Sequence, residues 1–477
     1  MTEKIKKIIP LRLFKAVQPI YHFVFSFLAA VYFRFPSRKL IIIGVTGTAG
    51  KTSTVYLIAK MLEKAGYKTG FTSTTVFSDG KREWLNDKKM TMPGRFFIQR
   101  LIGQMVKNGC RYAVVETTSE GIKQFRHRFI NYDVLIFTGL YPEHIESHGS
   151  FEKYKEAKGA LFKHLTRFKN KYVNDQKLVC RAKNGLNKLD LTRVKKTIIA
   201  NGDDTNVSYF LNFWAEVKIA YSLDENRSLA SITKGLSSEA ITKDFSFIKG
   251  VLNSAGIAGT DLEIAGNNIH LNLLGDFNAL NALAAYSIGL NQAIPSEKIK
   301  AGLESVRGLA GKMEMIDEGQ DFAAMVDYSF EPRALEKLYE TISLIQYQRL
   351  IHILGSAGGG RDKSRRQIMG EMAAHKADIV IITNEDPYDE DPAEIINQVA
   401  SGAEMAGKVN NQDLFKILDR GEAIKKALEL AQENDLVLIT GKGAEQYICS
   451  ANGVKIPWDD RKELKRAIVD KLCIDKR

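Results

Sequence analysis

The chain has 477 residues, of which 44% are hydrophobic and 26% charged, a balance that is typical of folded globular proteins and excludes disorder throughout. Its 37 glycines and 10 prolines exclude a fibrous chain, and its length suffices for about two to four domains. The formal net charge is +12, but +7 of it lies in residues 1–40, so the rest of the chain carries only +5 and no nucleic-acid partner is expected.

Residues 17–33 form an apolar run, VQPIYHFVFSFLAAVYF, with basic residues on both sides. A membrane-spanning helix needs about 20 such residues, so this run is at the short limit, and no signal-peptide cleavage site follows it. Two interpretations stay open. The run is a helix lying in or on the inner membrane surface, where Lys and Arg meet anionic lipid, with a true membrane span as the less favoured form of this interpretation, or it is a helix packed on the protein itself or on a partner.

From residue 40 onward, short apolar runs alternate with helical patterns, which predicts a doubly wound α/β domain. We expect buried strands at 40–45, 112–115 and 134–137, and helices at 52–65 and from Arg95. The more polar stretch 200–270 predicts a β-rich insertion, and 283–290 a helix. The four cysteines (Cys110, Cys180, Cys449 and Cys473) form no CxxC pair, which favours a reduced, cytosolic setting.

The alternation restarts in the second half of the chain, with strands expected at 325–328, 351–354, 379–383 and 436–440. A boundary near 308–312 separates the two halves. The predicted fold is α/β: a leader over 1–38, a central P-loop ATPase-like domain with a mainly parallel sheet over 39–309, and a Rossmann-like α/β domain over 310–477.

A glycine-rich loop follows the first predicted strand and leads into a helix, as a phosphate-binding loop does. Its sequence is GVTGTAGKT, residues 44–52. Lys51 is expected to reach the β- and γ-phosphates, and the Thr52 hydroxyl to ligate Mg²⁺. The candidate nucleotide-binding residues of this segment are Gly47, Thr48, Gly50, Lys51, Thr52 and Ser53.

Two further candidates lie after neighbouring strands. Glu116 ends the strand at 112–115, where a carboxylate can hold a metal ion above the loop. His144 follows the strand at 134–137 in the sequence YPEHIESHG and is a candidate for a metal or phosphate role. A strand-end acid facing solvent and a structural histidine are the alternatives.

The ordered set of motifs resembles the Mur ligases, and most of all the members that add the third residue of the peptidoglycan stem peptide. The set comprises TGTAGKT, ETTS at 116–119, HIESHG at 144–149, YKEAK at 154–158, GDFN at 275–278, GKME at 311–314, VDY at 326–328, GGGRDK at 358–363, DP at 386–387 and GKG at 441–443. The similarity covers about residues 39–477.

The resemblance implies an ATP-dependent amide-bond ligase that uses ATP and two Mg²⁺ ions. In this family ATP phosphorylates a substrate carboxylate, and the amine of an amino acid attacks the resulting acyl phosphate. The implied partners are an amino acid and an anionic muramyl-peptide, and the implied setting is the cytoplasm, with membrane contact through residues 1–38 as a further hypothesis.

The resemblance also implies roles for single residues. Lys51 contacts phosphate, Thr52 and Glu116 hold one Mg²⁺, His144 holds the second, and Lys158 carries a carbamate. Asn278 and Lys312 lie near adenine and ribose, and Asp327 closes the C-terminal domain over ATP. The residues matched to substrate positions are Thr91, Pro93, Ser119, Arg126, Arg361, Asp386, Gly441 and Glu445.

The sequence also departs from the family pattern. Ala49, Glu143, Glu120, Lys312, Ser329, Phe330 and Ala444 replace residues that are usual in the family. Tyr388 stands where diaminopimelate-adding members carry an Arg, which favours either a different amino acid or a different way of holding diaminopimelate. The acidic run of Glu385, Asp386, Asp389 and Glu390 suits the amine of lysine or ornithine, or is a solvated loop.

Only about 40 residues precede the phosphate loop, whereas the family has about a hundred there, in a domain that binds the UDP part of the substrate. We therefore expect that the remaining domains or a partner hold the UDP-sugar, or that the acceptor differs. Alternatives to the muramyl-peptide ligase are a Mur-like ligase acting on a lipid-linked precursor, poly-γ-glutamate or folate, an isoglutamate-amidating relative, a catalytically weakened ATP-binding scaffold, and an unrelated P-loop phosphotransferase.

Overall fold

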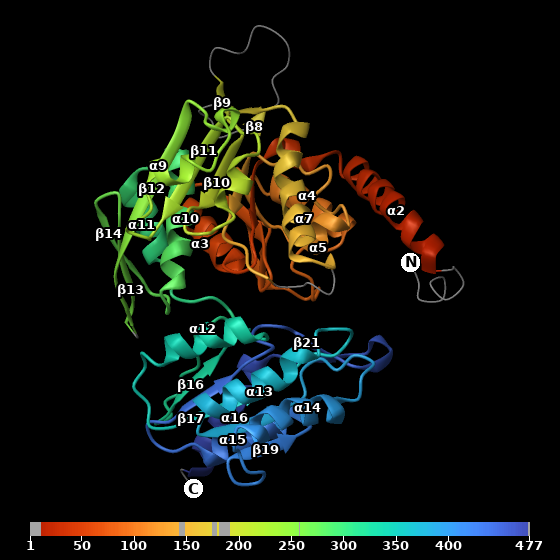
Figure 1. Ribbon diagram of the computed structural model, residues 1–477, viewed down its shortest axis with the longest axis vertical. Helices are drawn as coiled ribbons and strands as arrows, with labels where there is room; N and C mark the ends of the chain where they lie inside the picture. The colour runs from red at the N-terminus through yellow and green to blue at the C-terminus, as the bar shows by residue number, and fades with distance from the viewer. Residues whose placement is uncertain (1–10, 143–147, 174–178, 181–190, 257, 476–477) are drawn as a thin grey trace.

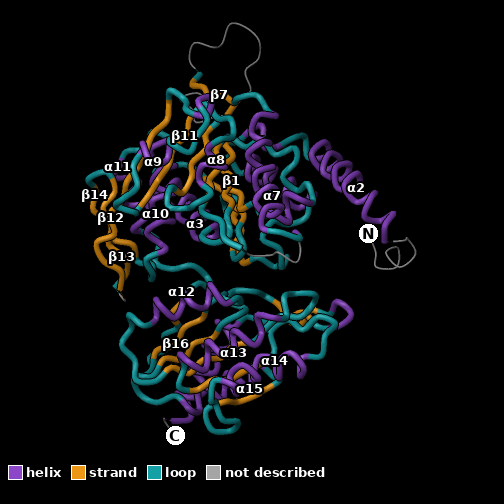
Figure 2. The backbone as a smooth tube through the Cα atoms, in the orientation of Figure 1, coloured by secondary structure: helices purple, strands orange, loops and turns teal. Residues whose placement is uncertain are grey.

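The computed structural model (Figure 1) describes residues 11–142, 148–173, 179–180, 191–256 and 258–475. Two large sheets organise this part of the chain, one of eleven strands and one of six. We call the part built on the first sheet the central region and the part built on the second the C-terminal region. Figure 2 shows the strands of both regions in orange with helices, in purple, packed beside them.

The eleven-stranded sheet is parallel through its middle and antiparallel at both edges. Its parallel strands lie in the order β12 (Asp244–Gly256), β11 (Val217–Ser222), β10 (Thr197–Asn201), β6 (Val134–Phe137), β1 (Ile41–Thr46), β5 (Tyr112–Glu116) and β2 (Thr69–Thr72). The antiparallel edges are β13 (Gly259–Ile264) with β14 (Asn267–Leu271), and β3 (Val76–Ser78) with β4 (Glu83–Leu85).

Helices cover both faces of this sheet because successive residues of a strand point to opposite sides. In β1, Ile41 and Ile43 pack in one hydrophobic core, while Ile42 packs in the other. The first core also holds α3 (Lys51–Lys64), α10 (Phe277–Asn291) and α11 (Ser296–Glu304). The second holds α4 (Arg95–Lys107), α5 (Ser119–Lys123), α7 (Phe151–His164), α8 (Val207–Leu211) and α9 (Leu229–Thr233).

The predicted strands at 40–45, 112–115 and 134–137 are confirmed, as are the helices at 52–65, from Arg95 and at 283–290. The prediction for 200–270 was right about β-structure and wrong about an insertion. β11 and β12 continue the parallel sheet beside β10, and β13 and β14 extend it further. The polar pattern arises because β12, β13 and β14 expose alternate residues at the sheet edge.

The six-stranded sheet has one antiparallel edge strand and is otherwise parallel. Its order is β15 (Glu314–Met315), β16 (Ala323–Val326), β20 (Leu436–Ile439), β17 (Leu350–Leu354), β18 (Ile379–Thr383) and β19 (Leu414–Ile417). One face packs on α12 (Pro332–Ile342), α13 (Ser364–Lys376) and α14 (Pro392–Met405), the other on α15 (Arg420–Leu430) and α16 (Asp460–Asp475). The four strands predicted for this half are confirmed.

Smaller elements complete the described structure. They are the three-stranded antiparallel sheet of β8 (Val179–Cys180), β7 (Lys171–Val173) and β9 (Thr192–Val194), the hairpin of β21 (Tyr447–Cys449) and β22 (Lys455–Pro457), and four 3₁₀ turns at Pro36–Lys39, Leu165–Arg167, Ser238–Ala240 and Ala451–Gly453.

Buried ion pairs tie elements together in each region. In the central region, the fully buried Asp133 carboxylate accepts from Lys171 Nζ at 2.5 Å and from Lys196 Nζ at 3.0 Å. In the C-terminal region, Arg420 of α15 donates to Asp460 of α16 at 2.7 Å. Such pairs are costly to break because removing one partner leaves an uncompensated buried charge.

Helix α2 (Leu11–Tyr32) contains the predicted apolar run and lies against α4 at the outer side of the central region (Figure 1). Ser26, Ala29 and Ala30 are buried, and the Ser26 hydroxyl donates to the Phe125 carbonyl at 2.9 Å. Nine large apolar side chains of α2 stay at least 38% exposed, among them Ile20 and Val24, although Phe23 and Phe27 also contact the ring of Phe129. None of the helices among the described residues is long and apolar enough to cross a membrane.

Candidate functional site

Several of the predicted site residues in each region follow the carboxyl ends of parallel strands, the usual position for ligand sites in α/β sheets. In the central region the phosphate loop follows β1, Glu116 ends β5, and Thr138 follows β6. In the C-terminal region Asp327 follows β16, Glu385 follows β18, and Gly441 follows β20. Parallel pairing brings the members of each group to one sheet edge.

The phosphate loop is held in shape by its neighbours. Gly50 has a left-handed φ of 77°, and an added Cβ there would lie 2.4 Å from the Asn281 side-chain oxygen, so only glycine fits. Thr48 N–H donates to the Gly139 carbonyl at 2.8 Å, and the Thr138 hydroxyl donates to the Ala49 carbonyl at 2.6 Å. Lys51 Nζ donates to the Thr48 carbonyl at 2.6 Å, which folds the lysine back over the loop.

Glu116 is fully buried behind the loop and accepts hydrogen bonds on both carboxylate oxygens. The Thr52 hydroxyl lies 3.0 Å from Oε2 and 3.2 Å from Oε1, and Thr74 donates its backbone N–H to Oε2 at 2.8 Å and its hydroxyl to Oε1 at 3.0 Å. Burial raises the pKa of Glu116, while the Lys51 charge opposes that shift. Thr52 and Glu116 thus present adjacent oxygen atoms, the ligand type that Mg²⁺ prefers.

Lys158 lies inside the site. Judged by its own sequence it is a surface lysine of a helix, yet its side chain is only 1% exposed. Its Nζ donates to the Gly47 carbonyl at 2.7 Å and lies 4.6 Å from the centre of the Tyr154 ring. Tyr154 in turn places its hydroxyl 3.2 Å from the Thr48 hydroxyl. The YKEAK motif on α7 therefore supports the back of the phosphate loop.

Asn278 and Asn281, at the start of α10, connect to the helix that follows the loop. Asn281 donates to the Asn278 side-chain oxygen at 3.0 Å and accepts from the Thr54 hydroxyl at 3.2 Å. Asn278 itself donates to the Leu274 carbonyl at 2.8 Å. Asn278 is thus positioned by a hydrogen-bond chain that runs to α3.

Lys312 and Asp327 belong to the C-terminal region but lie toward the loop. Burial lowers the pKa of Lys312, and the charges that act on it are those of Asp327, Glu116 and Lys51. Lys312 Nζ also lies 4.8 Å from the centre of the Tyr328 ring. Asp327 is buried and accepts from Met313 N–H at 2.8 Å and Ser329 N–H at 2.7 Å, so it fixes the turn that carries Lys312.

The central-region residues matched to substrate positions lie close together beside Glu116. The Thr91 hydroxyl is 3.0 Å from that of Thr74, and Arg126 donates to the Met92 carbonyl, next to the buried Pro93. Ser119 begins α5, and its hydroxyl lies 3.2 Å from Nε2 of His148. Burial lowers the pKa of Arg126.

The buried Asp386 and the partly buried Glu445 form an acidic cluster in the C-terminal region. Lys442 Nζ donates to Asp386 at 2.9 Å and to Glu445 at 2.6 Å, and Lys89 from the central region donates to both at 2.7 Å. Glu385 is 4% exposed, burial raises its pKa, and its Oε2 has no hydrogen-bond partner. Gly441 packs on it, since an added Cβ would meet that oxygen at 2.5 Å.

The acidic run that suits a ligand amine is divided by the fold. Glu390 accepts from Arg366 at 3.0 Å and pairs with Lys363 at 3.2 Å, and exposed Asp389 accepts from Asn452 N–H at 2.8 Å. Only Glu385 and Asp386 of the run are buried at the strand end. Arg361 is exposed on the loop before α13.

His144, the proposed ligand of the second Mg²⁺, lies outside the described residues, as does Glu143. Within the described part of the chain, no three His, Cys, Asp or Glu side chains gather as a metal site. The site also uses residues that sequence reasoning left out of its list. Thr74 lies in a Thr-rich turn, Lys442 lies in the GKG motif and Tyr154 in the YKEAK motif. Nothing in the sequence around Lys89 indicates a role in the site.

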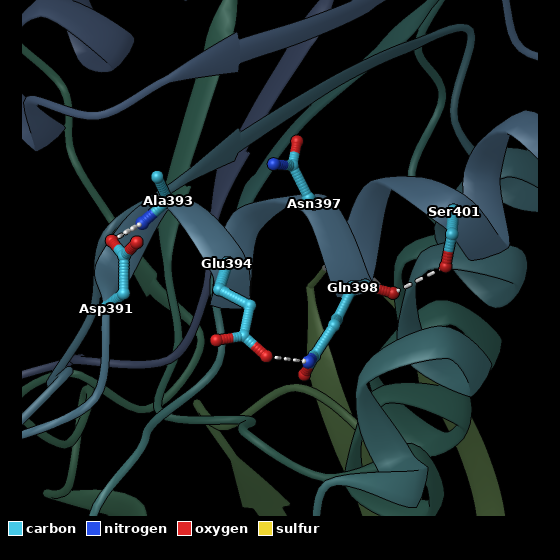
Figure 3. Close-up of a pocket in the computed structure, with 6 residues that line it drawn as sticks. All are labelled: Asp391, Ala393, Glu394, Asn397, Gln398 and Ser401. Carbon is cyan, nitrogen blue, oxygen red and sulfur yellow. Dashed lines mark hydrogen bonds between the residues drawn. The ribbon is translucent and has the colours of Figure 1, made fainter.

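A surface hollow of about 440 Å³ lies along α14 (Figure 3). Asp391 caps the helix by accepting from Ala393 N–H at 2.9 Å, and Gln398 donates to Glu394 at 2.9 Å. Gln398 also accepts from Arg366 of α13 at 2.7 Å, and the hollow contains no predicted site residue.

Comparison with known proteins places this architecture in a family. Residues 45–194 match the Mur ligase middle domain, and residues 311–443 match the Mur ligase, glutamate ligase domain. The UDP-N-acetylmuramyl-tripeptide synthetase of Roseiflexus sp. (strain RS-1) is 34% identical over 447 residues, which cover 93% of this chain and 81% of that protein. The chain belongs to the Mur ligase family. This confirms the resemblance seen in the motifs.

Other Mur ligase relatives agree. The UDP-N-acetylmuramoyl-L-alanyl-D-glutamate–2,6-diaminopimelate ligase of Geobacillus kaustophilus (strain HTA426) is 32% identical over 94% of this chain and 82% of its own length. A solved structure of such a diaminopimelate ligase has a TM-score of 0.56 at 26% identity, covering 91% of this chain and 79% of that one. The folylpolyglutamate synthase of Mycobacterium tuberculosis, at 15% identity and a TM-score of 0.61, shares the fold.

Mur ligases use ATP and Mg²⁺ to form amide bonds, and this chain is an ATP-dependent amide-forming ligase of that family. The predicted fold class is confirmed as well: a P-loop region on a mainly parallel sheet, followed by a second α/β region.

Proposed function

We propose that this Mur ligase adds an amino acid to a muramyl-peptide acceptor in peptidoglycan synthesis. The observation that supports the proposal most directly is that the central region contacts predicted site residues of the C-terminal region. The phosphate loop with Thr52 and Glu116 lies in the central region, and Lys89 of that region pairs at 2.7 Å with Asp386 and Glu445, the predicted substrate residues of the C-terminal region. A relative that matches 93% of the chain is a UDP-N-acetylmuramyl-tripeptide synthetase.

The chemistry needs a leaving group because a carboxylate is a poor electrophile. ATP supplies it: the acceptor carboxylate oxygen attacks the γ-phosphorus, ADP leaves, and an acyl phosphate remains. The amine nitrogen of the amino acid then attacks the carbonyl carbon, inorganic phosphate leaves, and the amine loses its proton. Lys51 and Lys312 supply cations that offset the charge gathered between ATP and the acceptor.

The residues present fit Mg²⁺, because Thr52 and the buried Glu116 offer adjacent oxygen atoms beside the phosphate loop. In this proposal Thr52 and Glu116 hold one ion and His144 the second. Lys158 is carbamylated, which turns its ammonium into an anion near the loop. Its burial against Gly47 and Tyr154 supports a role inside the site.

We assign nucleotide recognition to Gly47, Thr48, Gly50, Lys51, Thr52, Ser53, Asn278, Lys312 and Asp327. We assign the acceptor to Thr91, Pro93, Ser119 and Arg126, and the amino acid to Asp386, Gly441 and Glu445, with Arg361 on the neighbouring loop. The corresponding domains are 39–309 and 310–477, with 1–38 as a leader.

The test is phosphate release by the purified protein with UDP-muramyl-dipeptide and single amino acids. Release that requires ATP, Mg²⁺, acceptor and one amino acid together supports the ligase. ATP binding without turnover under every combination would favour a scaffold. Lys51→Ala serves as the inactive control, because it removes the phosphate-contacting cation without touching the amino-acid cluster.

We further propose that the enzyme works in the cytoplasm with α2 in contact with the inner membrane face. Nine large apolar side chains of α2 are 38–74% exposed, including Ile20, Val24, Leu28 and Val31, which recur at helical spacing on one side. Residues 1–40 hold eight basic residues and one acidic residue, which complements anionic lipid.

Vesicle co-sedimentation tests this contact. Ile20→Glu with Leu28→Glu should abolish binding to vesicles containing anionic lipid, whereas Val409→Glu, at another exposed apolar residue in the C-terminal region, should leave it unchanged. Equal sedimentation of all three proteins would overturn the proposal. The same variants, assayed on UDP-linked and lipid-linked acceptors, show whether the contact serves a membrane-bound acceptor.

A further inference from the structure

Lys89 crosses from one region of the protein to the other. It lies in the loop between β4 and α4 of the central region, yet its Nζ lies 2.7 Å from Asp386 Oδ2 and 2.7 Å from Glu445 Oε2 of the C-terminal region. The side chain is only 8% exposed, and Asp386 is equally covered. Exposed ion pairs contribute little, but a pair this well covered is held by the surrounding structure.

The backbone at Lys89 is adapted to this contact. Its φ is +53°, the left-handed conformation that costs about 1 kcal/mol or more for a residue with a Cβ. The residue just before it provides a contrast, because Lys88 pairs with its neighbour Asp87 and is 37% exposed. Of these two adjacent lysines, Lys88 lies at the surface and Lys89 extends across the interface between the two regions.

The carboxylates that receive Lys89 already have one cation of their own region. Lys442 donates to both, Cys449 N–H donates to Asp386 at 2.7 Å, and the Tyr328 hydroxyl lies 3.3 Å from Glu445. Without Lys89, two carboxylates face a single ammonium group, beside the buried Glu385. A second ammonium group is what this cluster lacks, and Lys89 supplies it.

We propose that Lys89 is a latch: its ammonium group closes the C-terminal region onto the central region and fills the Asp386–Glu445 pair until an amine-bearing ligand replaces it. The replacement rests on the proposed function, which assigns these carboxylates to the amino acid; the closure does not. Lys89 is thus a positioning residue, two positions before Thr91 on the acceptor side, that links occupancy of the amino-acid side to the relative position of the two regions.

Lysine methylation read by mass spectrometry tests the contact on the ligand-free protein. Lys89 should react at least tenfold more slowly than Lys88. Asp386→Asn combined with Glu445→Gln, which keeps side-chain size and removes both charges, should bring the Lys89 rate to that of Lys88. Equal rates for the two lysines in the unmodified protein would overturn the latch.

Small-angle X-ray scattering tests closure. Lys89→Met should increase the radius of gyration, Lys89→Arg should preserve it, and Lys88→Met is the matched control that should change nothing. Butylammonium chloride should expand the unmodified protein in a saturable way, whereas tetramethylammonium chloride at equal ionic strength should not. An unchanged radius in Lys89→Met would overturn closure, and equal effects of the two salts would overturn replacement. These readouts need no turnover, so they stand or fall separately from the ligase activity.

Discussion

Replacing Glu116 by Gln separates what this carboxylate does for the fold from what it does for catalysis. Glu116 receives the Thr74 N–H on Oε2 and two hydroxyl groups, from Thr52 and Thr74. Gln has the same shape. Its amide oxygen accepts from Thr74 N–H, and its NH₂ group donates to the two hydroxyl oxygens after these rotate. No buried polar group is left without a partner.

The charge that is lost contributes nothing to stability at neutral pH. Burial raises the pKa of Glu116 in the folded protein above that of the unfolded chain. A raised carboxyl pKa stabilises the fold at low pH, and that stabilisation is lost as the pH rises through the folded pKa. Ionisation of this carboxylate therefore opposes folding, and because Gln is uncharged and keeps the hydrogen bonds, the free energy of unfolding should stay within about 1 kcal/mol of wild type or increase.

Activity should respond in the opposite way, because Gln cannot supply the negative charge that holds Mg²⁺ beside the phosphates in the proposed function. We expect ATP-dependent phosphate release to fall at least 100-fold, equal to about 2.7 kcal/mol, and the Mg²⁺ needed for half-maximal rate to rise. Urea unfolding and a Mg²⁺ titration of phosphate release measure the two effects. Wild-type activity with an unchanged Mg²⁺ requirement would refute the proposal that Glu116 holds Mg²⁺. A loss of several kcal/mol in the free energy of unfolding would refute the expectation that Gln preserves the hydrogen bonds of Glu116.

Three further predictions concern burial. Asp133→Asn leaves Lys171 in a core without its carboxylate and should cost about 3–5 kcal/mol in urea unfolding, whereas a change below 1 kcal/mol would contradict the buried network. Burial lowers the pKa of His164 and of His352 to about 3, so at pH 5 each is neutral in the folded protein and takes up a proton on unfolding. The free energy of unfolding should therefore fall as the pH drops below 6.5, by about 2 kcal/mol per histidine at pH 5. Equal urea unfolding midpoints at pH 7 and pH 5 would contradict this prediction. ¹³C-bicarbonate should give a carbamate NMR signal that Lys158→Arg abolishes, and a signal that persists in the variant assigns the carbamate elsewhere.

Hydrophobic patterning predicted most of the parallel strands, because strands buried on both faces are continuous apolar runs such as 41–43 and 379–382. It failed for 200–270, where half-exposed strands at a sheet edge look like a separate polar unit. No local pattern distinguishes a strand that begins a new sheet from one that extends an old sheet.

Site residues were predictable where the chemistry is local to one motif. The spacing of the glycine-rich loop alone indicates Lys51 and Thr52 as candidates, and the position at a strand end indicates Glu116. Lys158 needed the family resemblance, because its burial results from packing of α7 against the loop and not from its own neighbours in sequence. Lys89 was not predictable, since its partners lie 297 and 356 residues away.

The most direct test of the central claim is a phosphate-release assay that omits one component at a time. We predict release only when ATP, Mg²⁺, a muramyl-peptide acceptor and an amino acid are all present, with a new amide product in equal amount and no release by Lys51→Ala. Release that is independent of the acceptor, or undiminished in Lys51→Ala, would contradict it.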